Sequence, residues 1–327
     1  MKKPKVFLTR KLPPKAMDRL RMETDLDMNM EDRVLTKEEI IKGVRGKDAL
    51  LCLLTDQIDA EVLSANPDLR VVANYAVGFN NIDVEAATNL GIPVSNTPGV
   101  LTETSADLTF ALILAVGRRI PESDKYIRTG EWTGWGPLQF LGTDIHGSTL
   151  GIIGMGRIGK ALVKRAKGFG MNVKYWNRTR LNQEEEKLLG IEYLSFSDLL
   201  KDADFISLHV AYNQETHHLI GPGELEKMQS TAVLINTSRG AVVDERALVH
   251  ALQSGQIWGA GLDVFENEPK VEPELLEMDQ VVILPHLGSA TIATRTRMAM
   301  IAIDNLLAVV QGKPAPNLVN KEVYFSK

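Results

Sequence analysis

The sequence predicts an α/β protein with two doubly wound domains, each built on a parallel β-sheet. Short apolar runs rich in β-branched residues alternate with stretches of helical periodicity, which is typical of βαβ units. This alternation occurs twice along the 327 residues, and a glycine-rich turn at positions 154–159 follows the first strand of the second series. A chain of this length also suits two domains of ordinary size. We therefore expect two parallel sheets, each covered by helices on both faces.

The first series contains four predicted strands and four predicted helices. The strands are at positions 6–8, 49–54, 71–75 and 92–95. The helices are at positions 14–22, 36–44, 60–65 and 84–90. Thr36 and Glu39 have the spacing of a capping box, which marks the start of the second helix. A longer helix from about 102 to 118 follows, and we expect its apolar stretch at 110–116 to pack in a core.

The second series contains six predicted strands, enough for a complete doubly wound sheet. They are at positions 149–154, 171–176, 205–210, 232–236, 261–265 and 281–284. A last helix at 291–310 has no sheet of its own to cover, so we expect it to return to the first domain. The tail beyond Gly312, which contains Pro314 and Pro316, is expected to be a surface extension.

These elements predict how the chain divides into domains. Residues 1–99 and 287–327 are expected to form one discontinuous, flavodoxin-like domain. Residues 100–286 are expected to form a Rossmann domain that is inserted into it.

Composition and charge exclude several functional classes. The formal net charge is −5 and no run of five Lys or Arg residues occurs, so nucleic-acid binding is not expected. The longest apolar stretch, at 110–116, is far too short to span a bilayer. The apolar run at 6–8 is too short for a signal peptide, so we expect a cytoplasmic protein. Cys52 is the only cysteine and lies in an apolar run, which predicts a buried, inert thiol.

The glycine-rich turn has the GxGxxG pattern of a dinucleotide-binding fingerprint. Its residues are Gly154, Met155, Gly156, Arg157, Ile158 and Gly159. The turn follows a strand and opens a helix at 157–167, which is the context that the fingerprint requires. The first glycine allows a tight turn, the second lets the backbone approach a diphosphate, and the third lets the helix pack on the sheet. The helix N-terminus then offers N–H groups to an anion.

The end of the second strand of this domain bears on the choice of cofactor. The fingerprint expects an acidic residue there, about 20 positions on, to bind the ribose hydroxyls. The sequence instead has Asn177, followed by Arg178, Thr179 and Arg180. Two guanidinium groups and two neutral polar groups suit a 2′-phosphate. We therefore expect NADP(H) to be preferred, with NAD(H) as the alternative if the arginines are ordinary solvated charges.

Three polar residues follow apolar runs of the second series: Arg239, Glu268 and His286. Arg can hold a carboxylate through a bidentate pair, and His can exchange a proton near neutral pH. Glu can orient the His and stabilise its cationic form. Because the carboxyl ends of parallel strands meet at one edge of a sheet, we expect the three to share a crevice with the dinucleotide. Such a set can reduce a keto acid; a structural ion pair is the alternative for Arg239.

The other histidines lack this context. His217 and His218 are adjacent, but no Cys or carboxylate cluster with ligand spacing accompanies them. Solvated loop histidines are therefore expected there, and no metal site. His209 ends a predicted strand and is expected to line the cofactor cleft, whereas His146 and His250 are assigned no catalytic role.

Motifs throughout the chain resemble those of one enzyme family. They lie at positions 74–83, 154–159, 236–240, 261–269 and 285–291. Together they resemble the D-2-hydroxyacid dehydrogenases, most closely the glyoxylate/hydroxypyruvate reductase branch. The resemblance implies that Arg239 anchors the substrate carboxylate and carbonyl, that His286 donates the proton in reduction, and that Glu268 pairs with this histidine. Asn267 precedes Glu268, at a position where the family usually has an acidic residue.

The resemblance also implies contacts for substrate, cofactor and partner. The backbone of Val77 and Gly78, together with Leu53, would bind a small 2-keto or 2-hydroxy acid. The further cofactor-binding residues that it implies are Thr237, Ser238, Asp263 and Gly288. Asp263 would lie near the nicotinamide amide, with a buried helix-capping role as the alternative. Trp132 and Trp135 lie where relatives place dimer contacts and a pocket aromatic, which implies a homodimer.

Two other functions remain open at this point. The first is a regulatory protein that uses this fold to sense a nucleotide, although a sensor does not need Arg239, Glu268 and His286 together. The second is a dehydrogenase for another small 2-hydroxy acid. A formate-type dehydrogenase is disfavoured because that family has Gln in place of Glu268, and a phosphoglycerate-type enzyme because it usually has an additional regulatory domain.

Overall fold

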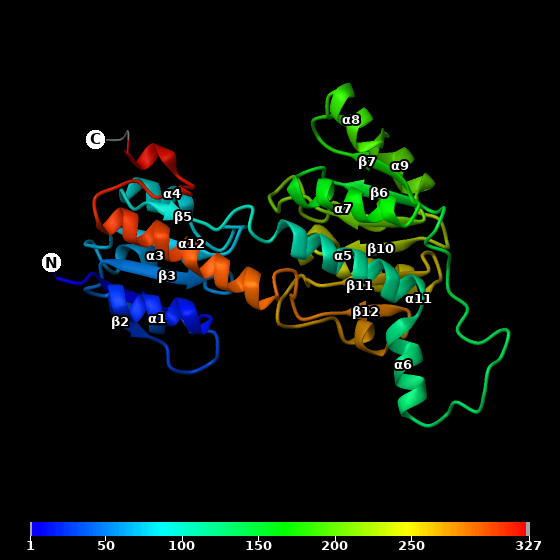
Figure 1. Cartoon of the computed structure of the whole chain (residues 1–327), viewed down its shortest axis with the longest axis horizontal. Coiled ribbons are helices and arrows are strands. Elements are labelled where there is room, and N and C mark those ends of the chain that lie inside the picture. The colour runs from blue at the N-terminus through cyan, green and yellow to red at the C-terminus, as the bar shows by residue number, and fades with distance from the viewer. Residues whose placement is uncertain (1, 325–327) are drawn as a thin grey trace. The chain divides into compact units, whose positions relative to one another are not determined.

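The computed structural model describes residues 2–324 and divides into two units. The first unit is Met1–Leu101 with Ser289–Lys327, and the second is Thr102–Gly288. These boundaries lie two residues beyond the predicted ones at 99 and 286. Figure 1 labels many of the elements of both units, and each unit is described below by itself.

The first unit contains a five-stranded sheet in the order β2-β1-β3-β4-β5, in which all pairs are parallel. Its strands are β1 (Lys5–Leu8), β2 (Asp25–Met28), β3 (Ala49–Leu53), β4 (Val71–Tyr75) and β5 (Val94–Ser95). The prediction of four strands was wrong because it missed β2. This strand lies at the edge of the sheet, where two of its four residues are acidic and none is buried, so it has no apolar run.

Helices cover both faces of this sheet. They are α1 (Pro14–Glu23), α2 (Lys37–Val44), α3 (Ala60–Ser64), α4 (Val84–Asn89) and α12 (Ile292–Val310). The capping box of Thr36 and Glu39 is present at the start of α2. Helices α1 and α12 pack together on one face, visible in blue and orange in Figure 1. Helices α2, α3 and α4 cover the other face, where Cys52 lies fully buried.

The expectation of a surface extension after Gly312 was wrong. The segment lies along β5: Leu318 forms an antiparallel bridge with Ser95, and Val319 N donates to Val94 O over 2.7 Å. Asn320 is 2% exposed, and its side-chain oxygen accepts from Val94 N over 2.7 Å. The 3₁₀ helix η3 (Lys321–Tyr324) then buries Val323. The segment thus pairs with an edge strand of only two residues, β5, which would otherwise leave its backbone groups unpaired.

The second unit contains a seven-stranded parallel sheet in the order β12-β11-β10-β9-β6-β7-β8. Its strands are β6 (Thr149–Ile153), β7 (Asn172–Trp176), β8 (Glu192–Tyr193), β9 (Phe205–Leu208), β10 (Val233–Asn236), β11 (Gly259–Leu262) and β12 (Val281–Ile283). The prediction of six strands missed β8, which has two residues and lies at an edge. The strand order reverses between β6 and β9, where open α/β sheets bind ligands.

Helices cover both faces of this sheet as well. They are α5 (Thr102–Gly117), α6 (Ile120–Arg128), α7 (Arg157–Gly168), α8 (Gln183–Leu189), α9 (Phe196–Asp202), α10 (Pro222–Leu225) and α11 (Glu245–Gln253), with 3₁₀ helices η1 (Gly240–Val242) and η2 (Pro273–Glu277). Helices α5 and α7 lie side by side on one face (Figure 1). Helices α9, α10 and α11 cover the other. No helix in residues 2–324 is long and apolar enough to cross a membrane.

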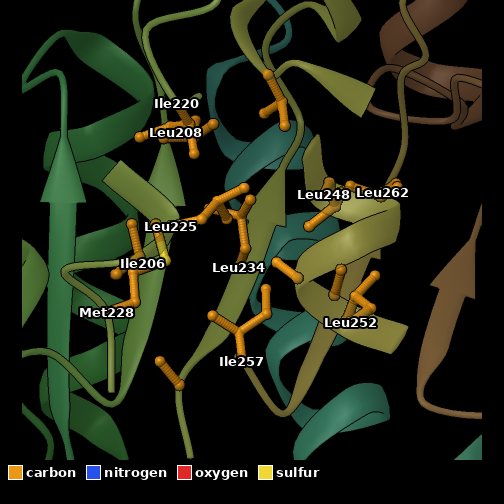
Figure 2. Packing of buried hydrophobic residues seen from close by; sticks show 14 of the residues in the cluster. Ile206, Leu208, Ile220, Leu225, Met228, Leu234, Leu248, Leu252, Ile257 and Leu262 are labelled. Carbon is orange, nitrogen blue, oxygen red and sulfur yellow. The ribbon is translucent and has the colours of Figure 1, made fainter. Parts of the chain in front are cut away.

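The packing of β9, β10 and β11 places the carboxyl ends of these strands. Consecutive residues of β10 point to opposite faces and enter different cores. Leu234 belongs to the core under α10 and α11, and Ile235 belongs to the core under α5 and α7. Figure 2 shows the first of these cores, with Leu248 and Leu252 of α11 beside Leu234. Because both faces are buried, the register of these strands is fixed, and so is the point at which each loop leaves the sheet.

Candidate active site

The three predicted catalytic residues lie beyond the ends of three adjacent strands. Arg239 follows β10, Glu268 follows β11 and His286 follows β12. These strands pair in parallel, β10 with β11 and β11 with β12. The structure therefore brings together, within one unit, side chains that are 47 positions apart in the sequence.

His286 and Glu268 form a hydrogen-bonded pair. The distance from His286 Nδ1 to Glu268 Oε2 is 2.9 Å, and Phe265 N donates to Glu268 Oε1 over 3.2 Å. Burial raises the pKa of Glu268, but the hydrogen bond from His286 and the charges of His286 and Arg239 outweigh burial, so this pKa is lowered. Glu268 is thus a carboxylate at neutral pH and can only accept. His286 therefore carries a proton on Nδ1, and its Nε2 is the nitrogen available to a ligand.

The backbone at His286 is held in an uncommon conformation. Its φ is 55°, in the left-handed region that non-glycine residues rarely adopt. His286 N donates to Asp263 O over 3.0 Å, and the Asp263 carboxylate accepts from Leu287 N over 2.6 Å and from Gly288 N over 2.8 Å. Asp263 is 1% exposed, and burial raises its pKa although these amides and the charge of His286 oppose this. Asp263 therefore anchors the turn that carries His286; its contact with nicotinamide remains a prediction.

Arg239 begins at a turn that Asn236 organises. The Asn236 side chain, 1% exposed, donates to Arg239 O over 2.9 Å and accepts from Ser238 N over 3.0 Å. Arg239 Nη1 donates to Ser238 O over 2.7 Å. Burial lowers the pKa of Arg239, and the negative charge of Glu268 opposes this shift. A guanidinium in such a partly desolvated position can bind a carboxylate more strongly than one in water.

The turns after β10 and β11 touch through their backbones. A Cβ atom built on Gly240 would lie 1.8 Å from the carbonyl carbon of Phe265, so only glycine fits. Glu245, which is 4% exposed, accepts a hydrogen bond from Glu266 N and holds the same loop from the start of α11. These contacts fix the loop of Glu268 next to Arg239. The motif at 236–240 includes Asn236 but does not indicate that it holds this turn, and no periodicity or motif in the sequence had singled out Glu245.

The expectation of solvated loop histidines holds for His217, which is exposed, but not for His218. His218 is half-buried, and its Nε2 lies 2.8 Å from Glu266 Oε1. The ring of His217 stacks on that of His218 with centroids 3.9 Å apart. His218 thus links the 217–221 segment to the loop of Glu268. Within residues 2–324, no group of three or more His, Cys, Asp or Glu side chains could hold a metal ion.

The glycine-rich turn has the geometry that a diphosphate needs. Gly154 has a φ of 100°, and a Cβ there would lie 2.7 Å from the carbonyl carbon of His209. A Cβ on Gly159 would lie 2.4 Å from Gly154 O, whereas one on Gly156 would meet nothing within 4 Å. Gly156 also precedes α7 without a side-chain cap. The helix N-terminus therefore faces open space beside the second glycine, which fits a dinucleotide diphosphate.

The four residues after β7 differ in what they are free to bind. Asn177 Oδ1 accepts from Met155 N over 3.1 Å, and its Nδ2 donates to Thr179 O over 2.8 Å. Arg180 forms two hydrogen bonds of 2.8 Å with Glu186, which also accepts from Tyr175 Oη over 2.7 Å.

Arg180 and Tyr175 lower the pKa of Glu186 to about 2, so this pair is ionic throughout the neutral range. Arg178 lies in a different setting: its side chain is 80% exposed, and it contacts Glu215 at 2.8 Å. Of the two arginines that the sequence assigned to a phosphate, Arg180 already has a bidentate carboxylate partner.

The remaining predicted cofactor residues lie around the same sheet edge. Thr237 Oγ1 is 2.8 Å from Thr109 Oγ1, and Gly288 O accepts from Ser105 Oγ over 3.1 Å. His209 borders Gly154, its Nε2 lies 2.8 Å from Ser207 Oγ, and burial lowers its pKa to about 4. His209 is therefore neutral at pH 7 and presents a polar wall without charge.

The predicted substrate residues of the first unit belong to two turns. Leu53 is the last residue of β3, and Val77 and Gly78 follow β4; all three are half-buried. The side chain of Asn81 holds the turn after β3, because its Nδ2 donates a hydrogen bond to Leu53 O over 3.1 Å. In the second unit, Trp132 and Trp135 are 53% and 85% exposed.

Known proteins match this chain over most or nearly all of its length. Residues 110–288 match the family model described as D-isomer specific 2-hydroxyacid dehydrogenase, NAD binding domain. The chain is 51% identical over 328 residues to a glyoxylate reductase of Thermococcus litoralis, covering 99% of both chains. It is 51% identical to a glyoxylate reductase of Korarchaeum cryptofilum, covering 98% of this chain and 97% of the other.

Solved structures show the same fold over nearly the whole chain. The TT0316 protein of Thermus thermophilus matches with a TM-score of 0.90 and 46% identity, over 96% of this chain and 99% of that one. An NADPH-dependent glyoxylate/hydroxypyruvate reductase of Sinorhizobium meliloti, in complex with NADP and malonate, matches with a TM-score of 0.85 and 33% identity, over 97% of each chain.

Proposed function

Because the chain belongs to the D-isomer specific 2-hydroxyacid dehydrogenase family, we propose that it reduces glyoxylate and hydroxypyruvate to glycolate and D-glycerate, with NADPH as the preferred cofactor. The observation that carries this proposal is the 2.9 Å hydrogen bond between His286 Nδ1 and the ionised carboxylate of Glu268. The positive charge of Arg239 is near enough to help lower the pKa of Glu268. Full-length relatives named glyoxylate reductase support the choice of substrate.

The second unit supplies the groups that act on the carbonyl. Arg239 holds the substrate carboxylate and carbonyl oxygen, which fixes the orientation of C2. His286 donates a proton from Nε2 to the carbonyl oxygen as negative charge develops on it. Glu268 stabilises the imidazolium before the transfer and keeps Nε2 pointed at the substrate. In the oxidative direction, His286 accepts the proton instead.

The cofactor site follows from the glycine-rich turn. NADPH, when bound, supplies the hydride that adds to C2. Gly154, Gly156 and the N-terminus of α7 would hold its diphosphate, because the Cβ-free approach at Gly156 leaves the backbone accessible. Arg178, with Thr179 beside it, would hold the 2′-phosphate, since Arg178 is exposed and has a single surface contact at Glu215. The NADP-bound Sinorhizobium meliloti relative supports this preference.

The first unit would contribute residues of its own to substrate binding. We assign the substrate carboxylate to the backbone amides of Val77 and Gly78, and an apolar contact to Leu53, as the family resemblance implies.

A steady-state panel tests the proposal. Glyoxylate, hydroxypyruvate, pyruvate and a bulkier 2-keto acid are each assayed with NADPH and with NADH. We expect the highest kcat/KM for glyoxylate or hydroxypyruvate with NADPH. Absence of turnover on every keto acid, with tight NADPH binding retained, would contradict the proposal and support the nucleotide-sensing alternative. A higher kcat/KM with NADH would leave the enzyme class but remove the cofactor preference.

We also propose that two copies of the chain pair through the segment 120–141. Helix α6 has no buried residue, and several apolar side chains of this segment are exposed by half or more. They are Ile120, Ile127, Trp132, Trp135, Leu138 and Leu141. A contiguous apolar segment of this kind is typical of an obligate contact between subunits. Sedimentation equilibrium should give a dimer for the native chain and a smaller species for Trp135→Glu; a monomeric native chain would refute the pairing.

A further inference from the structure

In the segment 76–79 of the first unit, the backbone carbonyl oxygens of the first three residues each accept a hydrogen bond. Ala76 O accepts from Thr97 N over 2.8 Å, and Val77 O accepts from Asn96 Nδ2 over 2.7 Å. Gly78 O accepts from Asn74 Nδ2 over 3.0 Å. Three consecutive peptide groups are therefore held by donors on the protein side of the segment.

The orientation of these carbonyls determines where the amides point. In a planar trans peptide the C=O and the following N–H point in opposite directions. The N–H groups of Val77, Gly78 and Phe79 are therefore turned away from Thr97, Asn96 and Asn74. Within residues 2–324, none of these three amides donates to another protein group. Successive backbone N–H groups that are free of protein acceptors form a site for an anion.

The two asparagine side chains are themselves fixed by further amides. Asn74, which is 1% exposed, also donates to Asn81 Oδ1 over 3.1 Å. Asn81 is 5% exposed, and its Nδ2 donates to Leu53 O over 3.1 Å and to Asp56 O over 3.0 Å. One buried chain of amide groups thus connects the turn after β4 to the turn after β3.

Asn96 is fixed from the opposite side, by helix α12 and the segment that follows it. Asn305 of α12 donates to Asn96 O over 2.9 Å, and Asn96 N donates to Asn317 O over 3.2 Å. Asn305 Oδ1 accepts from Asn317 N over 3.0 Å, which completes the set. Every group that orients the segment is uncharged. A neutral donor can fix a carbonyl without adding a negative charge that would repel a bound carboxylate.

We infer that Asn96 and Asn74 are positioning residues that set the amides of residues 77–79 to bind the carboxylate of a small 2-keto acid. This inference rests on the proposed function for the identity of the anion. It adds two side chains that do not touch the substrate but determine how the backbone presents itself. Removing either donor frees a carbonyl to rotate, and the opposite amide rotates with it.

The test measures substrate affinity and cofactor affinity separately. Asn96→Ala should raise the KM for glyoxylate and the inhibition constant of malonate by roughly tenfold, the loss expected for one misaligned hydrogen bond to a charged group. The KM for NADPH should change by less than about twofold, since the dinucleotide fingerprint lies in the other unit. Asn96→Asp, which keeps the size but removes the donor, should raise both substrate constants at least as much. Asn74→Ala should act in the same direction.

Asn66→Ala is the matched control. Asn66 is 4% exposed in the same unit and donates to two carbonyls, Val44 O over 2.9 Å and Lys47 O over 2.7 Å, neither of them in the segment. It should lower the melting temperature and leave both substrate constants within about twofold.

Unchanged constants in Asn96→Ala and Asn96→Asp would overturn the inference, as would an equal rise in Asn66→Ala. Asn96, which is half-buried, decides the test if Asn74→Ala does not fold. A wild-type chain without turnover would defeat the proposed function, whereas malonate affinities of the variants, measured by calorimetry with NADPH bound, would still decide on the asparagines.

Discussion

The carboxyl edge of the seven-stranded sheet has two regions that place similar residues in different chemical settings. Beyond β12, His286 bonds the carboxylate of Glu268 at 2.9 Å. Beyond β9, His209 bonds the hydroxyl of Ser207 at 2.8 Å, and burial lowers its pKa to about 4. The end of a parallel strand is therefore not enough to make a histidine a proton donor. Its hydrogen-bond partner and its burial decide whether the imidazole can be a cation.

Two arginines at the same sheet edge, Arg239 after β10 and Arg180 after β7, also differ in their partners. Arg239 lies near Glu268, whose negative charge opposes the lowering of the Arg239 pKa by burial, and Glu268 also pairs with His286. Arg180 is bound by both oxygens of Glu186 at 2.8 Å. A carboxylate that pairs with both donor groups of a guanidinium, as Glu186 does with Arg180, ties that arginine into the fold.

The largest effect should separate the two histidines. His286→Ala should lower kcat by roughly 10²–10⁴-fold, the usual contribution of a general acid, because no group then protonates the carbonyl oxygen. His209→Gln should change kcat by less than about tenfold, since a neutral imidazole beside Gly154 can at most affect the cofactor. Steady-state kinetics with glyoxylate and NADPH would measure both, with NADPH binding by fluorescence as the control for folding. Near-normal turnover of His286→Ala would remove it from the mechanism.

A smaller loss should follow when His286 is given a neutral partner like that of His209. Glu268→Gln keeps a hydrogen-bond acceptor for Nδ1 but removes the negative charge. We expect kcat to fall roughly 10–100-fold, as typical of losing part of a general-acid effect, and the alkaline limb of the reduction profile to move to lower pH. The pKa of Glu268 is lowered from its ordinary value, so in the wild type its negative charge should be present at neutral pH and be lost only as pH falls through the lowered pKa. A profile for Glu268→Gln that superimposes on the wild type would refute this account.

Much of the catalytic region could be predicted from the sequence. Apolar runs located β10, β11 and β12, and the rule that parallel strands end at one edge brought Arg239, Glu268 and His286 together. The glycine turn was also predictable from the sequence: a side chain on Gly154 or Gly159 would clash with backbone atoms, and Gly156 has open space beside it.

What could not be predicted depends on contacts between side chains distant in sequence or on short, exposed elements. Glu186 looks like any helix acid, and only the fold brings it to Arg180. The strands β2 and β8 lie at sheet edges and lack apolar runs, so no periodicity marks them. The neutral side-chain amides of Asn74 and Asn96 donate to backbone carbonyls. Every residue has a backbone carbonyl, so no residue type in the sequence marks the acceptor. Charged motifs are therefore visible early, and uncharged positioning networks are not.

The two arginines after β7 should also separate. Arg178→Ala should raise the KM for NADPH roughly tenfold and leave that for NADH within about twofold, because only NADPH carries the 2′-phosphate. Arg180→Ala should lower the melting temperature instead and affect both cofactors alike, since it breaks the pair with Glu186. The measurement is KM for each cofactor at saturating glyoxylate, with thermal unfolding of both variants. Equal effects of Arg178→Ala on both cofactors would contradict a phosphate contact there.

The smallest effect should appear in the pH dependence of stability. The pKa of His209 is lowered from 6.5 to about 4 and that of Glu186 from 4.5 to about 2, so in both windows the unfolded chain binds more protons than the folded one. Stability should therefore fall as pH drops from 6.5 to 4, and again from 4.5 to 2. His209→Gln, which cannot gain a charge, should remove part of the first loss, a difference of a few degrees in melting temperature between pH 7 and pH 4.5.

Glu186→Gln is the companion variant for the second window, because its amide cannot be protonated there and it should flatten the curve below pH 4.5 alone. If His209→Gln and the wild type lose stability in parallel between pH 6.5 and 4, the pKa of His209 is the same in the folded and the unfolded chain. Burial would then not keep the imidazole of His209 neutral at acidic pH, and the contrast between the two histidines would rest on the position of Glu268 alone.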